Sequence, residues 1–335
     1  MGIVSGALDA LRFKDTIIYK ENTDLKEKYD ALKKLNEEYS NNDNLLNELY
    51  IVKKGLDGEN EISYQLKKAN IGMYVLRDIK LKFQDLTAQI DYILITPIFI
   101  YYIECKNLFG NITVNEKGDF IREYTLNGKK VRKGMYSPLR QVESQREVVR
   151  KIWESKTSTI EKIIASKNFY YYRKVLVVAA NQDTILNTSK APEEIKYKVL
   201  RADALVRQIQ NDLDHDKDSY IWSSKEMEEI AKNYIDLSCD ENINYYDYYK
   251  NKYCNDLIIS KNEDLDNTLK ERLIDFRKTR SNEMKIPAYY VFTNDELDKL
   301  VELKPKTIEQ LKKSNILSPI KIKTHGKKII NEINK

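Results

Sequence analysis

Residues 89–107, QIDYILITPIFIYYIECKN, contain two β-rich apolar runs that meet at Pro97. Runs of this kind predict two neighbouring buried strands. Each run nevertheless carries charge, because Asp91 lies in the first and Glu104 and Lys106 lie in the second. Unpaired charge inside an apolar sheet is costly. These three side chains therefore indicate a functional site rather than ordinary core.

The register of this predicted hairpin decides whether the two acids meet. If Pro97 and Ile98 form a two-residue turn, Asp91 lies opposite Glu104, and Lys106 points to the same face as Glu104. Directly opposed carboxylates lie about 5 Å apart and repel each other. A hard divalent cation between their oxygens turns that repulsion into binding energy. The pattern therefore predicts metal-dependent hydrolysis of phosphodiester bonds.

Other interpretations of the same residues stay open. A slip of one residue in register would place Asp91 and Glu104 on opposite faces of the sheet. Glu104 and Lys106 could also form an exposed ion pair on an edge strand, with Asp91 at a strand start. A nuclease-like fold can also serve as a binding platform without activity, because a fold does not determine function.

The composition is that of a protein with a heavily solvated surface. The chain has 335 residues, 33% of them charged, and a mean hydropathy of −0.61. This length predicts two or three domains. No apolar run approaches the roughly 20 residues of a membrane span, and the first residues lack the pattern of a secretory signal. The cysteines at 105, 239 and 254 are too widely spaced for a zinc knuckle or a disulfide framework, which favours a reducing cytoplasm.

Positive charge is concentrated near the C-terminal end. The formal net charge is +5, yet residues 268–335 hold 16 Lys and Arg against 9 Asp and Glu, so the rest of the chain is slightly acidic. A basic module on a nearly neutral body is typical of a protein that binds a polyanion. A lysine-rich solvated surface explains the charge equally well.

Hydrophobic periodicity predicts alternating helices and strands. The expected helices cover residues 22–52 with a break at 41–43, 58–68, 137–153 and 202–210. The expected strands cover residues 73–81, 89–96, 99–106, 112–114, 120–126 and 175–180, and a short strand starts at Val199. Asn127-Gly128 after the fifth of these strands is a turn signal.

Residues 239–266 lack clear periodicity and predict a linker with one short helix at most. The segment is rich in Asn, Asp and Tyr. Its tyrosines could stack on bases, but packing of the linker onto a domain is the favoured interpretation. These tyrosines are Tyr245, Tyr246, Tyr248, Tyr249 and Tyr253.

Four separated motifs occur in an order that is specific to one family. They are Lys54-Gly55-x-x-Gly58-Glu59, Gln89-x-Asp91, Glu104-x-Lys106-Asn107 with Gly110, and Pro138-x-x-Gln141. Through these motifs, residues 55–210 resemble the nuclease-related domain (NERD) family, which is similar to the PD-(D/E)xK nucleases. The resemblance implies an α/β restriction-endonuclease-like domain with a mixed sheet flanked by helices.

The resemblance implies a metal centre. Asp91 and Glu104 are expected to bind Mg²⁺ or Mn²⁺, with the main-chain carbonyl of Cys105 as a further ligand. The Cys105 side chain alternates away from the acids and is expected in the core. Neither of the two histidines lies near these motifs, so the sequence indicates no zinc site and no histidine-dependent triad.

The resemblance also implies catalytic roles for three further residues. Lys106 is expected to orient or deprotonate the attacking water and to stabilise charge on the phosphate. Glu59 is the helix-borne acid that completes or tunes the metal shell. Gln141 is the helix-borne glutamine that supports the site.

The C-terminal region resembles a second family. Its matching points are Ile286-Pro287, the run Tyr289-Tyr290-Val291-Phe292, Pro305 and Gly326. Through them, residues 268–335 resemble the HRDC domain (helicase and RNase D C-terminal), a small all-α helical bundle. The glycine-containing turn usual in that family before the last helix is replaced here by residues 315–319, NILSP.

Members of that second family bind nucleic acid weakly or mediate protein contacts. The basic residues expected to face phosphates are Arg277, Lys278, Arg280, Lys321, Lys323, Lys327 and Lys328. The alternative is that some of them are merely solvated.

Together these patterns predict a cytoplasmic, metal-dependent nuclease built of successive modules. The expected modules are an N-terminal helical arm at 1–50, the nuclease-like domain at 51–215, a helical or irregular linker at 216–266 and the HRDC domain at 267–335. DNA is favoured over RNA because both families are associated mostly with DNA transactions. The rival prediction is a non-catalytic nucleic-acid-binding or scaffolding protein that recruits a helicase, since the chain has no Walker A motif of its own.

Overall fold

The computed structural model describes residues 13–39, 42–126, 128–157, 168–216, 219–239 and 242–335, with the main chain alone at 255–265. The chain divides into two compact units, Met1–Tyr249 and Lys250–Lys335. Within the described ranges, no helix is both long enough and apolar enough to cross a lipid bilayer.

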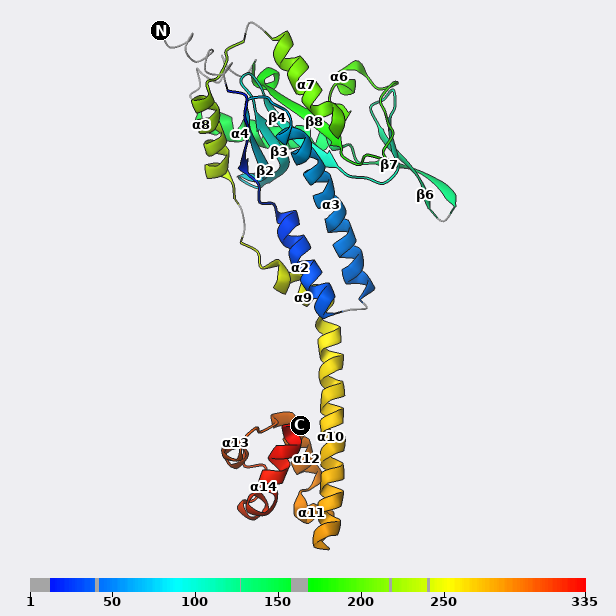
Figure 1. Ribbon diagram of the computed structural model, residues 1–335, viewed down its shortest axis with the longest axis vertical. Coiled ribbons are helices and arrows are strands. Elements are labelled where there is room, and N and C mark those ends of the chain that lie inside the picture. Colours follow the sequence, from blue (N-terminus) through cyan, green and yellow to red (C-terminus); the bar gives the residue numbers. More distant parts are fainter. Residues whose placement is uncertain (1–12, 40–41, 127, 158–167, 217–218, 240–241) are drawn as a thin grey trace. The chain divides into compact units, whose positions relative to one another are not determined.

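A mixed β-sheet forms the centre of the first unit (Figure 1). Its strands, in spatial order, are β1 (Thr16–Lys20), β2 (Met73–Phe83), β3 (Leu86–Ile95), β4 (Ile100–Lys106), β8 (Arg173–Ala179) and β10 (Val199–Arg201). The pairs β2–β3 and β3–β4 are antiparallel, whereas β1–β2, β4–β8 and β8–β10 are parallel. Parallel neighbours need a crossover connection, and the chain between β4 and β8 contains helix α4 (Pro138–Lys156).

Helices cover both faces of this sheet, as predicted. Besides α4, the helices of the first unit and its C-terminal border are α2 (Asp24–Glu38), α3 (Asp43–Lys67), α6 (Glu193–Lys196), α7 (Ala202–His215), α8 (Ser224–Leu237) and α9 (Tyr245–Tyr253). On one face, Val142 of α4 and Met227 of α8 share a core with Tyr102. On the other face, Ile62 of α3 and Leu205 of α7 share a core with the remaining sheet residues.

A smaller sheet extends from the same unit. Its strands, in spatial order, are β7 (Lys129–Met135), β6 (Phe120–Leu126), β5 (Asn111–Val114) and β9 (Leu186–Asn187). β5–β6 and β6–β7 are antiparallel. The strands predicted at residues 112–114 and 120–126 are therefore confirmed, they pair as a hairpin, and β7 extends it. Of the predicted turn between β6 and β7, Asn127 lies outside the described residues, and Gly128 has a φ of +76°.

The N-terminal region differs from the predicted helical arm in two ways. Residues 16–20 form β1, an edge strand of the main sheet, and no sequence pattern indicated so short a strand. The predicted break after α2 is confirmed, since the Asn42 side chain caps α3 by accepting a hydrogen bond from the Leu45 N–H at 3.1 Å. α3 then continues through Gly55 and Gly58, where two separate helical segments were expected. Packing of its buried face outweighs the roughly 1 kcal/mol that each helical glycine costs.

The predicted linker is partly packed on the first unit. α8 contributes to the core of the sheet, and Tyr245 of α9 donates a hydrogen bond to Asp24 Oδ2 at 2.6 Å. Tyr249 is buried, and Tyr246 donates to Glu38. For these three tyrosines the packing interpretation is confirmed.

The second unit is a helical bundle, as predicted. Its helices are α10 (Asn255–Met284), α11 (Ala288–Val291), α12 (Asn294–Leu303), α13 (Ile308–Lys313) and α14 (Pro319–Ile333). α10 starts earlier than expected, because residues 255–284 contain neither Gly nor Pro to stop the helix. Thr293, Thr307 and Ser318 cap α12, α13 and α14 with their side-chain oxygens.

Candidate active site

The β3–β4 hairpin has the register that the sequence predicted. The Thr96 N–H donates to the Phe99 carbonyl at 2.9 Å across the Pro97-Ile98 turn. Tyr92 pairs with Ile103, and the next position in the same register brings Asp91 opposite Glu104. The slip that would have separated the two acids is therefore excluded.

Asp91 lies half-buried at the point where β3 leaves this pairing. Its Oδ2 accepts a hydrogen bond from the Cys105 main-chain N–H at 2.7 Å. Burial and the neighbouring Glu104 carboxyl raise the pKa of Asp91 well above its usual range, against the opposing effect of the Cys105 hydrogen bond. The Cys105 side chain packs on the α3 side of the sheet, as expected from strand alternation.

Glu104 is buried and is held from two directions. Its Oε1 forms an ion pair with the Lys106 ammonium on the same face of β4. Lys106 Nζ also donates to Gln141 Oε1 at 3.2 Å, which places the glutamine of the fourth motif, on α4, beside the lysine of the third. On the other side, Gln145 Nε2 lies 3.4 Å from Glu104 Oε2 and donates to the Gln89 carbonyl at 2.6 Å.

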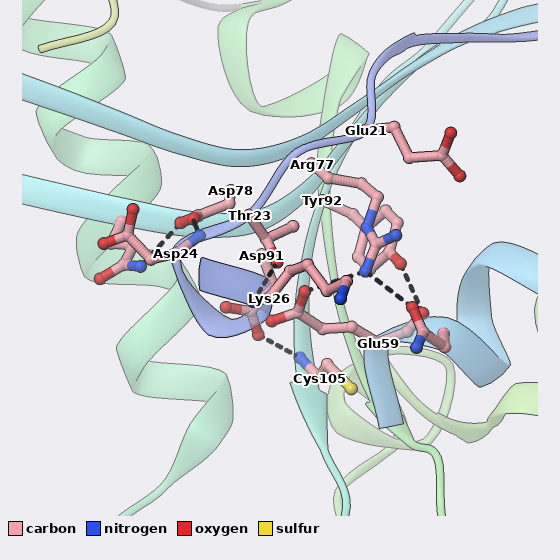
Figure 2. A network of polar contacts seen from close by, with 12 residues as sticks. Glu21, Thr23, Asp24, Lys26, Glu59, Arg77, Asp78, Asp91, Tyr92 and Cys105 are labelled. Atoms are coloured by element: carbon pink, nitrogen blue, oxygen red, sulfur yellow. Dashed lines mark hydrogen bonds and ion pairs between the residues drawn. The ribbon is translucent and has the colours of Figure 1, made fainter. Parts of the chain in front are cut away.

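Glu59 reaches the site from α3 because that helix packs unusually close to the end of β4. A Cβ atom at Gly58 would lie 2.5 Å from the Asn107 Cβ, so only glycine permits this approach. Figure 2 shows the side chains of Glu59, Arg77 and Asp91 converging, and Glu59 Oε2 pairs with Arg77 Nη2 at 3.2 Å. Burial raises the pKa of Glu59 to about 7 despite the Arg77 charge.

Two of these acids, Asp91 and Glu104, could hold a magnesium-type ion if water supplied the other ligands. The Glu104 carboxyl raises the pKa of both Asp91 and Glu59, and the Glu59 carboxyl also raises that of Asp91. No three His, Cys, Asp or Glu side chains gather tightly enough, in the described part of the chain, to hold a metal ion by themselves. Mg²⁺ does not require such a cage, since it commonly uses one or two carboxylates and keeps several waters. The amide oxygen of Gln145 is buried without a hydrogen-bond partner and offers a further oxygen at this point.

A cavity of about 760 Å³ opens beside these acids. It exposes Asp91 and Glu59 together with two lysines, Lys28 of α2 and Lys151 of α4. The other lining residues are Leu25, Leu86, Thr87, Ala88, Gln89, Tyr136, Gln141, Ser144, Gln145, Glu147 and Val148. The lining combines these two lysines with three acids, Glu59, Asp91 and Glu147, so positive and negative charge lie side by side in the cavity.

Arg77 and Gln145 are site residues that no motif indicated. Arg77 could have been found by the reasoning used for β3 and β4, because it is a charged residue inside the apolar run of β2. Gln145 could have been found from Gln141, since residues four apart share one face of a helix. Asp78, buried next to Arg77, accepts hydrogen bonds from the Gln89 side chain at 2.7 Å and the Asp24 N–H at 2.6 Å. Asp78 thereby fixes the start of α2 beside the site.

The predicted phosphate-facing residues of the second unit fall into two groups. Lys278, Lys323, Lys327 and Lys328 are exposed. The others are engaged within the bundle. Arg277 donates to Asn294 Oδ1 at 2.9 Å, Arg280 pairs with Glu283 at 2.8 Å and Lys321 pairs with Glu296 at 2.7 Å.

Comparison with protein families agrees with both parts of this architecture. Residues 54–178 match the nuclease-related domain family (NERD), and residues 266–333 match the HRDC domain family. The chain carries a nuclease-related domain and an HRDC domain. Comparisons with curated proteins and with solved structures found no match.

The match to the nuclease-related domain covers the whole candidate site. It starts just before Glu59 on α3, includes Asp91, Glu104, Lys106 and Gln141, and ends in β8. The HRDC match covers most of α10 and all of α11 to α14. A nuclease-related function for the first unit and nucleic-acid binding for the HRDC domain are what these matches indicate; the role of each site residue stays a prediction.

Proposed function

We propose that this protein is a metal-dependent nuclease that hydrolyses phosphodiester bonds in nucleic acid, with DNA as the favoured substrate. The observation that carries this proposal is the pairing of two acids, Asp91 and Glu104, at the end of the β3–β4 hairpin, with Lys106 beside them. Two repelling carboxyls at a sheet end stabilise no fold. They are useful where a cation and a phosphate bind, as in the nuclease-related domain that contains them.

Each residue of the site would have its own role in the reaction. Asp91 and Glu104 would hold Mg²⁺ or Mn²⁺, with the Cys105 carbonyl as the predicted further ligand. The bound cation would polarise the scissile phosphate and acidify a coordinated water. Lys106 would orient the attacking water and balance negative charge on the phosphate, and its hydrogen bond to Gln141 would keep its ammonium in place. Glu59, paired with Arg77, would tune the charge of the site from α3.

A second function, nucleic-acid binding without catalysis, is favoured by one observation. Glu104 and Glu59 already have internal cationic partners in Lys106 and Arg77, so the site is partly neutralised without a metal. A scaffold that recruits a helicase through its HRDC domain would need no more than this.

One experiment separates the two functions. The purified full-length protein is incubated with labelled linear, circular and single-stranded DNA and with RNA, in Mg²⁺, Mn²⁺ or EDTA. The nuclease proposal requires cleavage that EDTA abolishes and that is absent in Glu104→Gln. Binding without cleavage under all metal conditions would instead support the scaffold. We also propose a cytoplasmic location, where the thiols of Cys105, Cys239 and Cys254 would stay reduced.

A further inference from the structure

The β6–β7 hairpin concentrates positive charge beside the candidate active site. Residues 120–135 contain five basic residues and one acidic residue, a net charge of +4 in a chain whose total is +5. None of the family motifs falls in this segment. The basic residues are Arg122, Lys129, Lys130, Arg132 and Lys133.

The strand register sorts these residues onto two faces. Arg132 lies opposite Glu123, the hairpin's acid, and their side chains pair at 2.9 Å on one face. On the other face, Arg122 lies opposite Lys133. Lys129 lies on this same face, two of its cross-strand pairs nearer the hairpin tip. We call this second face the basic face. Among the described residues, its three cations have no acid within ion-pair distance.

The basic face opposes like charges, which weakens the hairpin on its own. Arg122 and Lys133 are directly opposite, and such pairs are destabilising. β5 pairs with β6 only as far as Glu123, so beyond that residue the hairpin is a two-stranded ribbon, which is marginal even without repulsion. Most of this ribbon lies outside the core, where only Phe120 and Met135 at its base pack. Figure 1 shows the hairpin extending away from the main sheet of the first unit. An anionic ligand would turn this repulsion into binding.

An aromatic ring on the same face indicates which class of anionic ligand would bind there. Arg122 lies over the ring of Tyr124 at 4.8 Å, and Tyr124 is partly exposed between Arg122 and the hairpin tip. Cations alternating with a stacking ring suit a nucleic-acid strand, which offers phosphates and flat bases at regular spacing.

The hairpin leads directly into the cavity. After β7 ends at Met135, the next residue, Tyr136, is 73% exposed and lines the cavity together with Asp91. α4 with Gln141 begins two residues later. Seven strand residues span roughly 23 Å, which is the length of several nucleotides. A strand bound along the basic face would therefore continue towards Asp91 and Glu104.

We infer that the basic face of the β6–β7 hairpin, formed by Arg122, Tyr124, Lys129 and Lys133, binds the phosphodiester backbone next to the scissile phosphate. This inference rests on the proposed function for the meaning of the neighbouring site. It concerns binding, however, and is tested without cleavage.

The test uses full-length protein in EDTA with a fluorescent 30-nucleotide single-stranded DNA, and follows anisotropy at several salt concentrations. Lys129→Ala/Lys133→Ala should bind at least roughly tenfold more weakly at low salt, and the slope of log affinity against log salt should shrink by about 1.4. The matched control is Lys225→Ala/Lys232→Ala, which removes two exposed lysines of α8 in the same unit. It should bind like the wild type.

Two further measurements keep the result specific to the hairpin. Lys130→Ala on the opposite face should lose less affinity than Lys129→Ala. The melting temperature of Lys133→Ala should be unchanged or higher, because Arg122 loses a like-charged neighbour. Unchanged affinity in the double variant, or equal loss in the α8 control, would overturn the inference. The inference would also be overturned if the hairpin lysines bound anionic vesicles and their substitution left DNA binding unchanged. If the protein binds DNA through this face but never cleaves it, the hairpin inference stands and the nuclease proposal fails.

Discussion

The main-chain N–H of Cys105 donates a hydrogen bond to Asp91 Oδ2 over 2.7 Å. This bond crosses from β4 to β3 one residue beyond the regular ladder, so it holds the Asp91 carboxyl at the position of its cross-strand neighbour, Glu104. A protein that only needed a stable hairpin end would place an apolar or oppositely charged pair there. The consequences of this arrangement can be measured.

Asp91→Asn and Glu104→Gln should each abolish metal-dependent cleavage without unfolding the protein. Both changes keep the size and hydrogen-bonding shape of the side chain but remove a carboxylate that would hold the cation. Losses of at least roughly 10² to 10³-fold in kcat are expected when such an electrostatic group is removed. Kinetics on labelled DNA, with circular dichroism to check folding, measure both effects. Full activity in Glu104→Gln would place any observed cleavage elsewhere.

The stability of Asp91→Asn relative to the wild type should increase with pH in metal-free buffer. The pKa of Asp91 is raised in the folded protein, mainly by burial and Glu104, above an unfolded value of about 3.9. At and below that unfolded value the acid is protonated in both states, and the substitution changes little. As pH rises towards the folded pKa, the wild type progressively loses stability that the asparagine variant keeps.

Urea denaturation at pH 4 and pH 8 in EDTA measures this difference. At pH 8, Mg²⁺ should reduce this difference in stability, because only the wild type has the Asp91 carboxylate that would bind the cation. Asp85→Asn, in the exposed β2–β3 turn, is the control. The difference in unfolding free energy between Asp91→Asn and the wild type could instead be the same at both pH values. That result would show that burial and Glu104 do not destabilise the Asp91 carboxylate in the folded protein.

Gln145→Met should reduce both stability and cleavage, although no motif contains this residue. Gln145 is buried and donates to the Gln89 carbonyl at 2.6 Å, and it borders Glu104. Loss of this hydrogen bond costs about 0.5–1.5 kcal/mol. The measurement is thermal unfolding combined with kcat. Gln141→Ala, at a less buried position, should lower kcat through Lys106 with a smaller effect on stability.

Whether a contact in this site can be predicted from the sequence depends on how far apart its two residues lie in the chain. The Asp91–Glu104 register was predictable because a two-residue turn fixes every pair that follows it. That Gln141 lies near the site was predictable only through the family motifs, since no local rule places α4 against β4. The Glu59–Arg77 ion pair was not predictable in this way, because it depends on how closely α3 approaches the sheet. That approach is set by contacts between residues far apart in the chain.

The same limit explains the differences in the fold. Strong local signals, such as the break at residues 41–43 that separates α2 from α3, were correctly identified. The strand at residues 16–20 and the early start of α10 were not, because the first depends on pairing with β2 and the second only on the absence of a stop signal. The basic face of the β6–β7 hairpin emerges only when the register of the two strands is known.

Gly58→Ala should destabilise the first unit and impair the site. Its new methyl group would lie 2.5 Å from the Asn107 Cβ and 3.3 Å from Cys105 Sγ, so α3 would have to move away from β4 and carry Glu59 with it. Overpacking of this kind costs about 1–3 kcal/mol, more than the helix propensity that alanine adds. Gly134→Ala is the control, because a Cβ there meets no atom within 4 Å. Equal melting temperatures for the two variants would contradict the close approach of α3.

In the HRDC domain, some lysines should bind nucleic acid, whereas others should stabilise the fold. Lys323 and Lys327 are exposed on α14, whereas Lys321 on the same helix is largely buried between Glu296 at 2.7 Å and the Tyr289 carbonyl at 3.1 Å. Lys323→Ala/Lys327→Ala should weaken DNA binding and reduce its salt slope by about 1.4 to 1.8, with the melting temperature unchanged. Lys321→Ala should lower the melting temperature and leave the slope as it is, because Glu296 loses its cation. Anisotropy titrations and calorimetry on the full-length protein measure both quantities. If neither variant changes the slope, the domain makes protein contacts instead, and a helicase becomes the partner to test first.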